Sequence, residues 1–133
     1  MNIHYTFSIE KITKDNLTTL FLSVEWDSAN YPDKLYEAIL NSHSVVTAWD
    51  GNKLVGLANA LSDGVMTAYF HYVVTDPTYQ GQGIGKAMMN RMLFQYQDYY
   101  TKVLISYPKA ISFYKRLGFE ADDESLPMYI FND

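Results

Sequence analysis

The chain has 133 residues, of which 48% are hydrophobic and 19% are charged, so it can bury the core of one domain and is not disordered by composition. Ten basic residues against 15 acidic ones give a net charge of −5, which argues against a nucleic-acid-binding protein because such proteins must neutralise phosphates. The absence of cysteine excludes disulfides, a thiolate nucleophile and zinc sites built on cysteine.

The first third of the chain predicts one strand and two helices. Residues 3–10, IHYTFSIE, alternate apolar and polar side chains and predict a strand. Thr13 or Asp15 can cap a helix on which apolar residues recur at helical spacing. These residues are Leu17, Leu20, Phe21 and Val24. After a polar loop over 26–34, Pro32 opens a second helix. Its apolar residues are Leu35, Ile39 and Leu40.

The middle of the chain predicts three consecutive strands. Residues 44–61 form two apolar runs around Asp50-Gly51-Asn52, which is a strong hairpin signal. A second turn, SDG, follows at 62–64. Residues 65–75, VMTAYFHYVVT, are apolar enough on both faces to form a central strand of the sheet.

The last part of the chain predicts two helices that alternate with strands. Apolar residues recur every four positions and predict a helix over about 83–96. They are Ile84, Met88, Met92 and Tyr96. Residues 102–107 predict a buried strand, Pro108 opens a helix that Gly118 ends, and 128–131, MYIF, predict a final strand. The order β-α-α-β-β-β-α-β-α-β predicts an α/β or α+β fold, with helices packed on a sheet.

We expect a single domain over residues 1–133 in the cytoplasm. No run approaches about 18 unbroken apolar residues, so we expect no membrane span. The start of the chain, MNIHYTFSIEKI, lacks the basic and apolar regions of a signal peptide.

A glycine-rich segment, YQGQGIGK at 79–86, separates the central strand from the next helix. It fails the dinucleotide-binding template G-x-G-x-x-G, because Lys86 stands where the last glycine belongs when the template starts at Gly81. It fails the Walker template, because Gln80 and Ala87 replace the first glycine and the hydroxyl residue. The free N–H groups at the start of a helix still favour an anion, most naturally a phosphate. The alternative is a tight turn in which glycine serves only a positive φ.

Three segments together resemble the GCN5-related N-acetyltransferases. Residues 80–85, QGQGIG, resemble the family's Q-x-x-G-x-G acetyl-CoA loop, and 75–80, TDPTYQ, resemble the approach to it. Residues 110–119, AISFYKRLGF, resemble the second signature of the family. The resemblance implies the family fold, a mixed central sheet of about six to seven strands with four helices. It also implies transfer of an acetyl group from acetyl-CoA to an amine.

The same resemblance implies which residues bind acetyl-CoA. The backbone amides of the loop would hold the pyrophosphate, through Gln80, Gly81, Gln82, Gly83, Ile84, Gly85 and Lys86. The end of the preceding strand would bind the acetyl carbonyl and the pantetheine arm, through Val73, Val74 and Thr75. Phe113 and Tyr114 of the second signature complete the site. Tyr107 stands where the family often has an asparagine that bonds the pantetheine, so a hydroxyl or backbone contact must replace it.

Acetyl transfer requires a base, a donor to the oxyanion and an acid for the thiolate. Because the chain has no cysteine, direct attack in a ternary complex is favoured over an acetyl-enzyme. The N–H near Val74 is the candidate oxyanion donor, and Tyr114 is the candidate acid, its alternative being a core aromatic. His71 is the candidate base, directly or through a water, since arylalkylamine N-acetyltransferases have a histidine at the matching distance from the loop. The alternative is a packed strand histidine.

The acceptor is predicted to be the primary amine of a small molecule. Trp26, Tyr31 and Tyr36 can form an aromatic wall, and Tyr69 takes the place of a second histidine in the arylalkylamine enzymes. Further carboxylates could bind an ammonium or simply be solvated. They are Asp27, Asp33 and Glu37.

Two other functions stay open, namely a protein acetyltransferase acting on lysine or an N-terminus, and a CoA-binding module without turnover. Since His4 and His43 lie outside every motif, they are predicted to be structural, and no metal site is expected. An exposed terminal strand would favour a homodimer.

Overall fold

The computed structural model describes residues 2–132 and divides the chain into two compact units, one up to Val103 and one from Leu104 onward. The elements are β1 (His4–Thr6), α1 (Lys14–Ser23), α2 (Pro32–Leu40), β2 (Ser44–Asp50), β3 (Lys53–Ser62), β4 (Thr67–Thr75), α3 (Ile84–Gln95), β5 (Thr101–Leu104) and α4 (Ile111–Arg116). Three short 3-10 helices lie at Asp27–Asn30, Pro77–Tyr79 and Pro108–Ala110.

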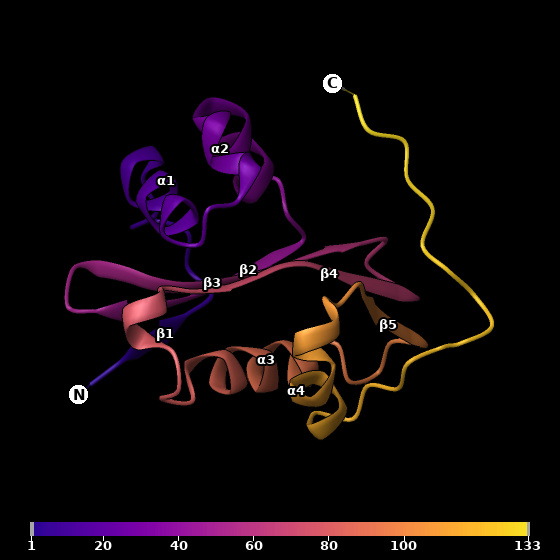
Figure 1. Cartoon of the computed structure of the whole chain (residues 1–133). Coiled ribbons are helices and arrows are strands. Elements are labelled where there is room, and N and C mark those ends of the chain that lie inside the picture. The colour runs from indigo at the N-terminus through magenta and orange to yellow at the C-terminus, as the bar shows by residue number, and fades with distance from the viewer. Residues whose placement is uncertain (1, 133) are drawn as a thin grey trace. The chain divides into compact units, whose positions relative to one another are not determined.

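The strands form one sheet in the order β1-β2-β3-β4-β5, and β1 to β4 pair antiparallel. Helices α1 and α2 cover one face of the sheet and α3 covers the other (Figure 1). The predicted mixed α/β architecture is confirmed, with helices on a central sheet in the predicted order up to α4.

Local sequence signals explain where the helices and turns begin. Thr13 rather than Asp15 caps α1: the Thr13 hydroxyl accepts from the Asn16 N–H, and the Asn16 side chain accepts from the Thr13 N–H. Pro32 opens α2 as predicted. The β2–β3 hairpin turns at Gly51, whose φ of +58° favours glycine.

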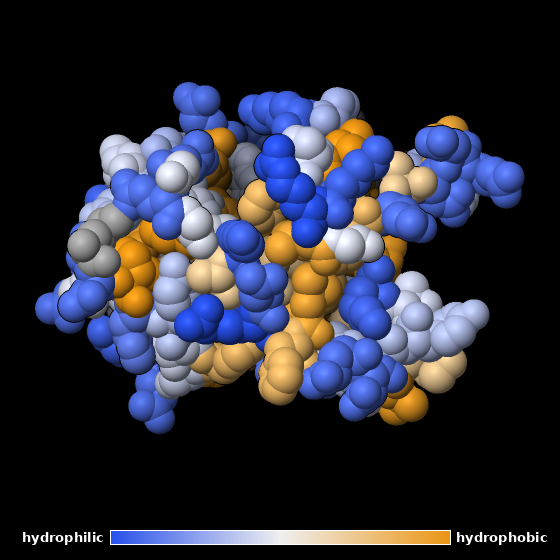
Figure 2. All heavy atoms as spheres, turned by 90° about the horizontal axis from the view of Figure 1, so that it is seen from below, coloured by the Kyte–Doolittle hydropathy of each residue, from blue (hydrophilic) through white to orange (hydrophobic). Residues whose placement is uncertain are grey.

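Each face of the sheet has its own apolar core. The core under α1 and α2 consists of Ile12, Leu17, Leu20, Phe21, Ala29, Leu35, Ile39, Val45, Trp49, Leu54, Leu57 and Val74. On the other face, the four apolar residues predicted for the α3 helix are buried, and Met89 is buried in addition. The four are Ile84, Met88, Met92 and the C-cap residue Tyr96. The outer side of α3 exposes Lys86, Asn90 and Arg91. Figure 2 views the molecule from this side and shows hydrophilic residues over most of the surface, with apolar residues gathered in patches.

Three predicted strands differ from the structure. The first is limited to β1, because the Thr6 and Ser8 hydroxyls accept from the N–H groups of Ser8 and Glu10 and form local turns. The strand predicted over 102–107 is shorter, at Thr101–Leu104, and none of its residues is buried as predicted. The strand predicted at 128–131 is wrong: these residues are exposed and have no strand conformation.

The sheet therefore has five strands among the described residues, fewer than the six to seven expected. Apolar residues with high β-propensity form a strand only where a neighbouring strand pairs with them, which a single sequence does not reveal. The homodimer was expected because of the last strand, so it has lost that support and stays an untested prediction. No helix within residues 2–132 is long and apolar enough to cross a membrane.

Candidate active site

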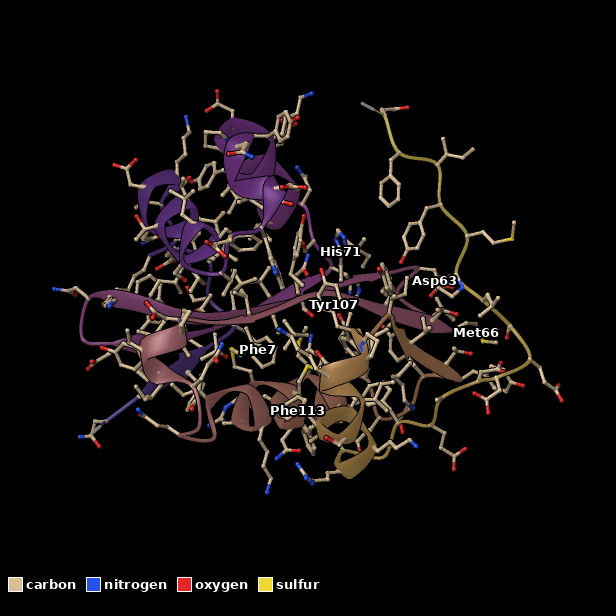
Figure 3. The ribbon with its side chains drawn as sticks, viewed as in Figure 1. Phe7, Asp63, Met66, His71, Tyr107 and Phe113 are labelled. Carbon is tan, nitrogen blue, oxygen red and sulfur yellow. The ribbon has the colours of Figure 1, made fainter. Side chains whose placement is uncertain are left out.

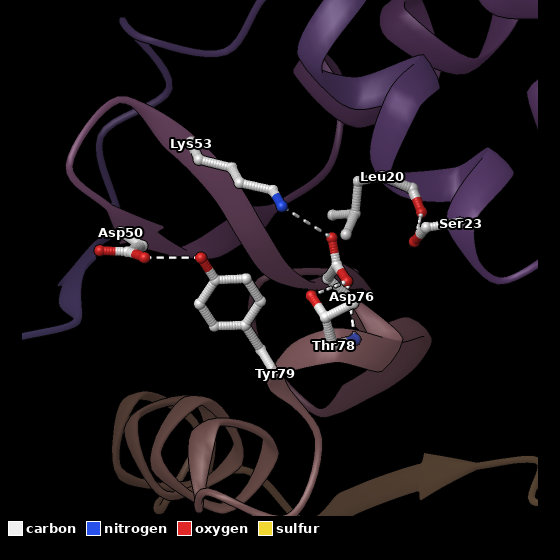
Figure 4. A network of polar contacts seen from close by, with 7 residues as sticks. All are labelled: Leu20, Ser23, Asp50, Lys53, Asp76, Thr78 and Tyr79. Atoms are coloured by element: carbon white, nitrogen blue, oxygen red, sulfur yellow. Dashed lines mark hydrogen bonds and ion pairs between the residues drawn. The ribbon is translucent and has the colours of Figure 1, made fainter. Parts of the chain in front are cut away.

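The turn that leaves β4 is built around a buried carboxylate. Asp76 is 8% exposed, and its Oδ1 accepts from the backbone N–H of Thr78 at 2.9 Å and from the Thr78 hydroxyl at 2.8 Å (Figure 4). Its Oδ2 lies 3.6 Å from the Lys53 ammonium. Burial alone would raise the pKa of Asp76, but the bonds from Thr78 and the charge of Lys53 outweigh it and hold the pKa below its usual value.

The segment that enters the glycine loop is also anchored to the β2–β3 hairpin. The Tyr79 hydroxyl donates to Oδ2 of Asp50 at 2.6 Å, and the Lys53 ammonium lies 5.1 Å from the centre of the Tyr79 ring (Figure 4). The hydrogen bond to Asp50 raises the pKa of Tyr79. The turn, the hairpin and the start of the loop are thus held together by polar contacts that the sequence did not suggest.

The N-terminus of α3, which follows the glycine loop, has no side-chain cap. Gly81 and Gly83 have φ of +79° and +82°, and Gly83 is the N-cap of α3 in the left-handed conformation, with no side-chain capping bond. The first helical bond runs from the Ala87 N–H to the Gly83 carbonyl, so the N–H groups of residues 84–86 have no acceptor within the helix. This arrangement fits an anion such as a phosphate.

Gly56 allows α3 to start close to the sheet. A Cβ at Gly56 would lie 3.0 Å from Cε of Met88 and 3.1 Å from Cγ2 of Ile84. Ile84 is buried, whereas Gly81, Gln82 and Gly83 before it are exposed. The loop is therefore fixed at its helical end and open to solvent over its glycines.

Strand β4 contains a β-bulge in the middle of its pairing with β3. Ala58 pairs with Val73 and Ala60 pairs with Phe70, so His71 and Tyr72 together oppose the single residue Asn59. A bulge of this kind interrupts the alternation of side chains along a strand. It therefore changes which residues of β4 share a face.

The bulge brings the ring of Tyr72 to the rings of Tyr69 and His71 on the face covered by α1 and α2. The His71 ring stacks on Tyr72 with 4.1 Å between centroids, and Tyr69 stacks on His71 at 5.5 Å. Neighbouring residues of a regular strand point to opposite faces and would not stack in this way. Figure 3 shows His71 on the side of the sheet where α1 and α2 lie.

Tyr72 joins these rings to the first helices. It packs edge-on against Phe21 at 5.0 Å and lies 5.8 Å from Trp26, and its hydroxyl is 2.7 Å from Oγ of Ser28. We call Trp26, Tyr69, His71 and Tyr72 the aromatic cluster. Trp26 and Tyr69, two of the predicted substrate residues, lie in this cluster, and their role in binding a substrate stays a prediction. Tyr72 was missed, because nothing in the sequence marks the bulge that turns it to this face.

The other predicted substrate residues have different surroundings. Tyr31 is 60% exposed at the junction with α2, and among the described residues no ring contact joins it to the cluster. Tyr36 packs against the core under α1 and α2. Asp33 forms an ion pair with Lys14, which supports its alternative as a surface carboxylate.

His71 is suited to accept a proton. Its partial burial lowers its pKa, which keeps the imidazole neutral at pH 7. The other histidines have different surroundings: Nδ1 of His43 lies 2.7 Å from the hydroxyl of the fully buried Tyr96, a structural role as predicted, and His4 lies in β1.

The backbone of β4 after the bulge presents alternate residues to its two edges. The Asp76 N–H donates to the Val55 carbonyl at 2.8 Å, so by antiparallel alternation the polar backbone groups of Val74 point to β3. Those of Val73 and Thr75 point away from β3, and the Gln80 side chain donates to the Thr75 carbonyl at 3.3 Å. This geometry favours the N–H of Val73 or Thr75, rather than that of Val74, as a donor to a ligand.

The predicted residues of the second signature belong to the second unit. Tyr114 packs edge-on against Phe113 at 5.0 Å and Phe119 at 5.9 Å, and burial raises its pKa. Tyr107 is 65% exposed and precedes the 3-10 helix at Pro108. The roles of Tyr107, Phe113 and Tyr114 in the site stay predictions. Within residues 2–132 no group of three or more histidine or acidic side chains could hold a metal ion.

Comparisons with known proteins agree on one family. A sequence model of the Acetyltransferase (GNAT) family matches residues 9–119. An uncharacterized N-acetyltransferase, ycf52, of Gracilaria tenuistipitata var. liui is 34% identical over 134 aligned residues, covering 95% of this chain and 71% of the relative. A protein of Glycine max named histone acetyltransferase TAP1 is 35% identical over 106 residues, or 70% of this chain. A chloroplastic protein of Oryza sativa subsp. japonica named serotonin N-acetyltransferase 2 is 34% identical over 74 residues, or 54% of this chain.

The chain spans 46% of the soybean relative and 37% of the rice relative. Among solved structures, a GNAT family protein of Streptococcus pneumoniae TIGR4 superposes with a TM-score of 0.82 at 25% identity, covering 98% of this chain and 97% of that one. The overall fold is therefore that of the family.

Proposed function

Since the chain belongs to the GCN5-related N-acetyltransferase family and is thus an acetyltransferase, we propose that it moves the acetyl group of acetyl-CoA to the primary amine of a small molecule by direct attack in a ternary complex. The observation that carries the proposal is the aromatic cluster, which includes His71 and lies on β4 shortly before the glycine loop. Aromatic faces bind both apolar groups and ammonium ions, so this surface suits an amine with an apolar body.

The first unit contains groups that fit the donor. The uncapped N-terminus of α3, preceded by two glycines in the left-handed conformation, would hold the pyrophosphate. The outward backbone groups of Val73 and Thr75 would bind the pantetheine arm and the acetyl carbonyl. Bound acetyl-CoA supplies an activated thioester carbonyl and a thiolate leaving group.

The residues of this chain then have distinct tasks. His71 takes a proton from the ammonium, directly or through a water, so that the amine nitrogen can form the new C–N bond. The N–H of Val73 or Thr75 donates to the carbonyl oxygen as negative charge develops on it. Tyr114 gives its proton to the sulfur as the C–S bond breaks, and its raised pKa keeps the phenol protonated until then. The second proton, which the nitrogen loses as the amide forms, passes through solvent and restores the phenol.

The relatives support two kinds of acceptor. The rice relative is named for serotonin, an arylalkylamine, and such an amine matches the aromatic cluster. The soybean relative is named a histone acetyltransferase, which keeps protein lysine as the second candidate acceptor. Both relatives are longer than this chain, so their names suggest substrates for it without assigning one.

A thiol-release assay with acetyl-CoA separates these functions. The acceptors would be tyramine, tryptamine and 2-phenylethylamine, an aliphatic amine such as putrescine, and a lysine-containing peptide. We expect the arylalkylamines to give the highest kcat/KM. Preference for the peptide would support the protein acetyltransferase instead. Tight binding of acetyl-CoA in calorimetry without thiol release from any acceptor would favour a binding module.

A further inference from the structure

An asparagine lies at the centre of the sheet, where an apolar residue would be expected. Asn59 is 2% exposed and pairs with Val45 of the core under α1 and α2. A buried amide is costly unless both of its ends are hydrogen-bonded. This amide is bonded at both ends, and one partner is the bulge of β4.

The Asn59 side chain connects the bulge to the end of α2. Its Oδ1 accepts from the backbone N–H of Tyr72 at 2.7 Å, and its Nδ2 donates to Oγ of Ser42 at 3.0 Å. The Ser42 hydroxyl in turn donates to the Ala38 carbonyl in the last turn of α2 at 3.1 Å. The amide oxygen of Asn59 thus gives the extra residue of the bulge an acceptor that an apolar side chain could not provide.

We propose that Asn59 is a positioning residue for acetyl transfer: its side chain holds the bulge of β4, and the bulge places Tyr72 against His71 on the face covered by α1 and α2. Without the bulge, strict alternation would put His71 and Tyr72 on opposite faces of the sheet. The catalytic consequence rests on the proposed function. The stacking of Tyr72 on His71 does not rest on it.

Tyr72 in the bulge is also held by its hydroxyl, so the contribution of Asn59 can be tested separately from that second bond. The Tyr72 hydroxyl bonds Ser28 in the 3-10 helix Asp27–Asn30, while Asn59 bonds the Tyr72 backbone. Loss of Asn59 therefore removes the constraint on the backbone at His71 and Tyr72 and leaves the end of the Tyr72 side chain bonded.

The test compares Asn59→Leu, a change of similar size without the amide, with Ser42→Ala. The control variant removes the other partner of the amide but keeps the bond from Asn59 to Tyr72. The first measurement is a pH titration followed by NMR of the ring C–H groups of ¹³C-labelled histidine. The His71 signal is assigned as the one that is absent from the spectrum of His71→Gln. The rings that stack on His71 are those of Tyr69 and Tyr72, so its chemical shift reports their geometry. This measurement needs neither acetyl-CoA nor an acceptor.

In Asn59→Leu we expect the His71 ring resonance to lose the shift that stacking on Tyr72 produces, and the pKa of His71 to move toward its ordinary value. In Ser42→Ala both should stay as in the wild type. With an accepted amine, kcat should fall about 10²-fold in Asn59→Leu, since small displacements of catalytic groups cost rates of this order. The KM for acetyl-CoA should stay within about twofold, since the loop is not touched.

A folded Asn59→Leu variant with the His71 resonance, its pKa and the rate all unchanged would overturn the proposal. If the leucine variant does not fold, Asn59→Ala removes the same bond without adding a branched side chain, and the same comparison applies. A moved His71 resonance in a chain that acetylates no amine would instead leave the positioning intact and refute the proposed function.

Discussion

Replacing Gly83 by alanine tests whether the uncapped N-terminus of α3 is the phosphate site. Gly83 has φ of +82°, and a Cβ added there would meet nothing within 4 Å, so the cost of the change lies in the backbone rather than in a clash. A left-handed conformation costs an ordinary residue about 1–2 kcal/mol. For a chain of this size that lowers Tm by roughly 3–8 °C. The backbone at the alanine either keeps this strained conformation beside the phosphate, or it relaxes and moves the N–H groups at the N-terminus of α3.

We therefore expect Gly83→Ala to fold but to bind acetyl-CoA at least tenfold more weakly, a loss of about 1.4 kcal/mol, measured by calorimetric titration. The matched control is Gly64→Ala in the β3–β4 turn. Gly64 has nearly the same φ, +81°, and its added Cβ would make only an ordinary contact at 3.6 Å with Nε2 of His43. The control should lose similar thermal stability and keep its affinity. Equal affinities in the two variants would refute the assignment of the loop as an anion site.

Three further changes test other parts of the site. Tyr114→Phe removes the proposed acid but keeps the ring, so kcat should fall about 10²-fold or more with little change in the Kd of acetyl-CoA, and a normal kcat would make Tyr114 a packing residue. Tyr79→Phe removes the bond to Asp50 that anchors the entry to the loop, so steady-state kinetics should show a higher KM for acetyl-CoA with kcat retained. Asp76→Asn should reduce Tm above about pH 4, and the difference from the wild type should shrink as the pH falls below 3.8, because the lowered pKa of Asp76 stabilises the fold only while the carboxylate is charged. A difference that does not vary in scans from about pH 2 to about pH 7 would show that the charge of Asp76 is not stabilising.

The helices and turns of the first unit could be predicted because their signals are local. The four-residue repeat of α3 survives in the structure as a buried stripe, and Thr13, Pro32 and Gly51 act at the cap and turn positions where their chemistry is favoured. The prediction of the last strand was wrong because strand formation depends on a partner strand and not on a local signal. The apolar character of 128–131 says nothing of which neighbour would pair with it.

The glycine loop could be predicted from its spacing, whereas the contacts that fix it could not. Asp76, Asp50 and Lys53 are ordinary polar residues in the sequence, and only the fold brings the hairpin beside the turn that leaves β4. Such contacts join residues more than 20 positions apart, as from Asp50 to Tyr79, and no local pattern records them. The same holds for Asn59, which looks like an isolated polar residue in an apolar strand.

The bulge also suits β4 to the two substrates of the proposed ternary complex. A regular strand would put His71, Val73 and Thr75 on one face, so a base and an acetyl group positioned by these residues would compete for the same space. After the bulge, Val74 rather than Thr75 faces α1 and α2, together with His71 and Tyr72. The polar backbone groups of Val73 and Thr75 point along the sheet, away from β3. In the proposed ternary complex, an acceptor would approach β4 across its face and the donor would lie along its side away from β3, so that the two would meet where the strand ends.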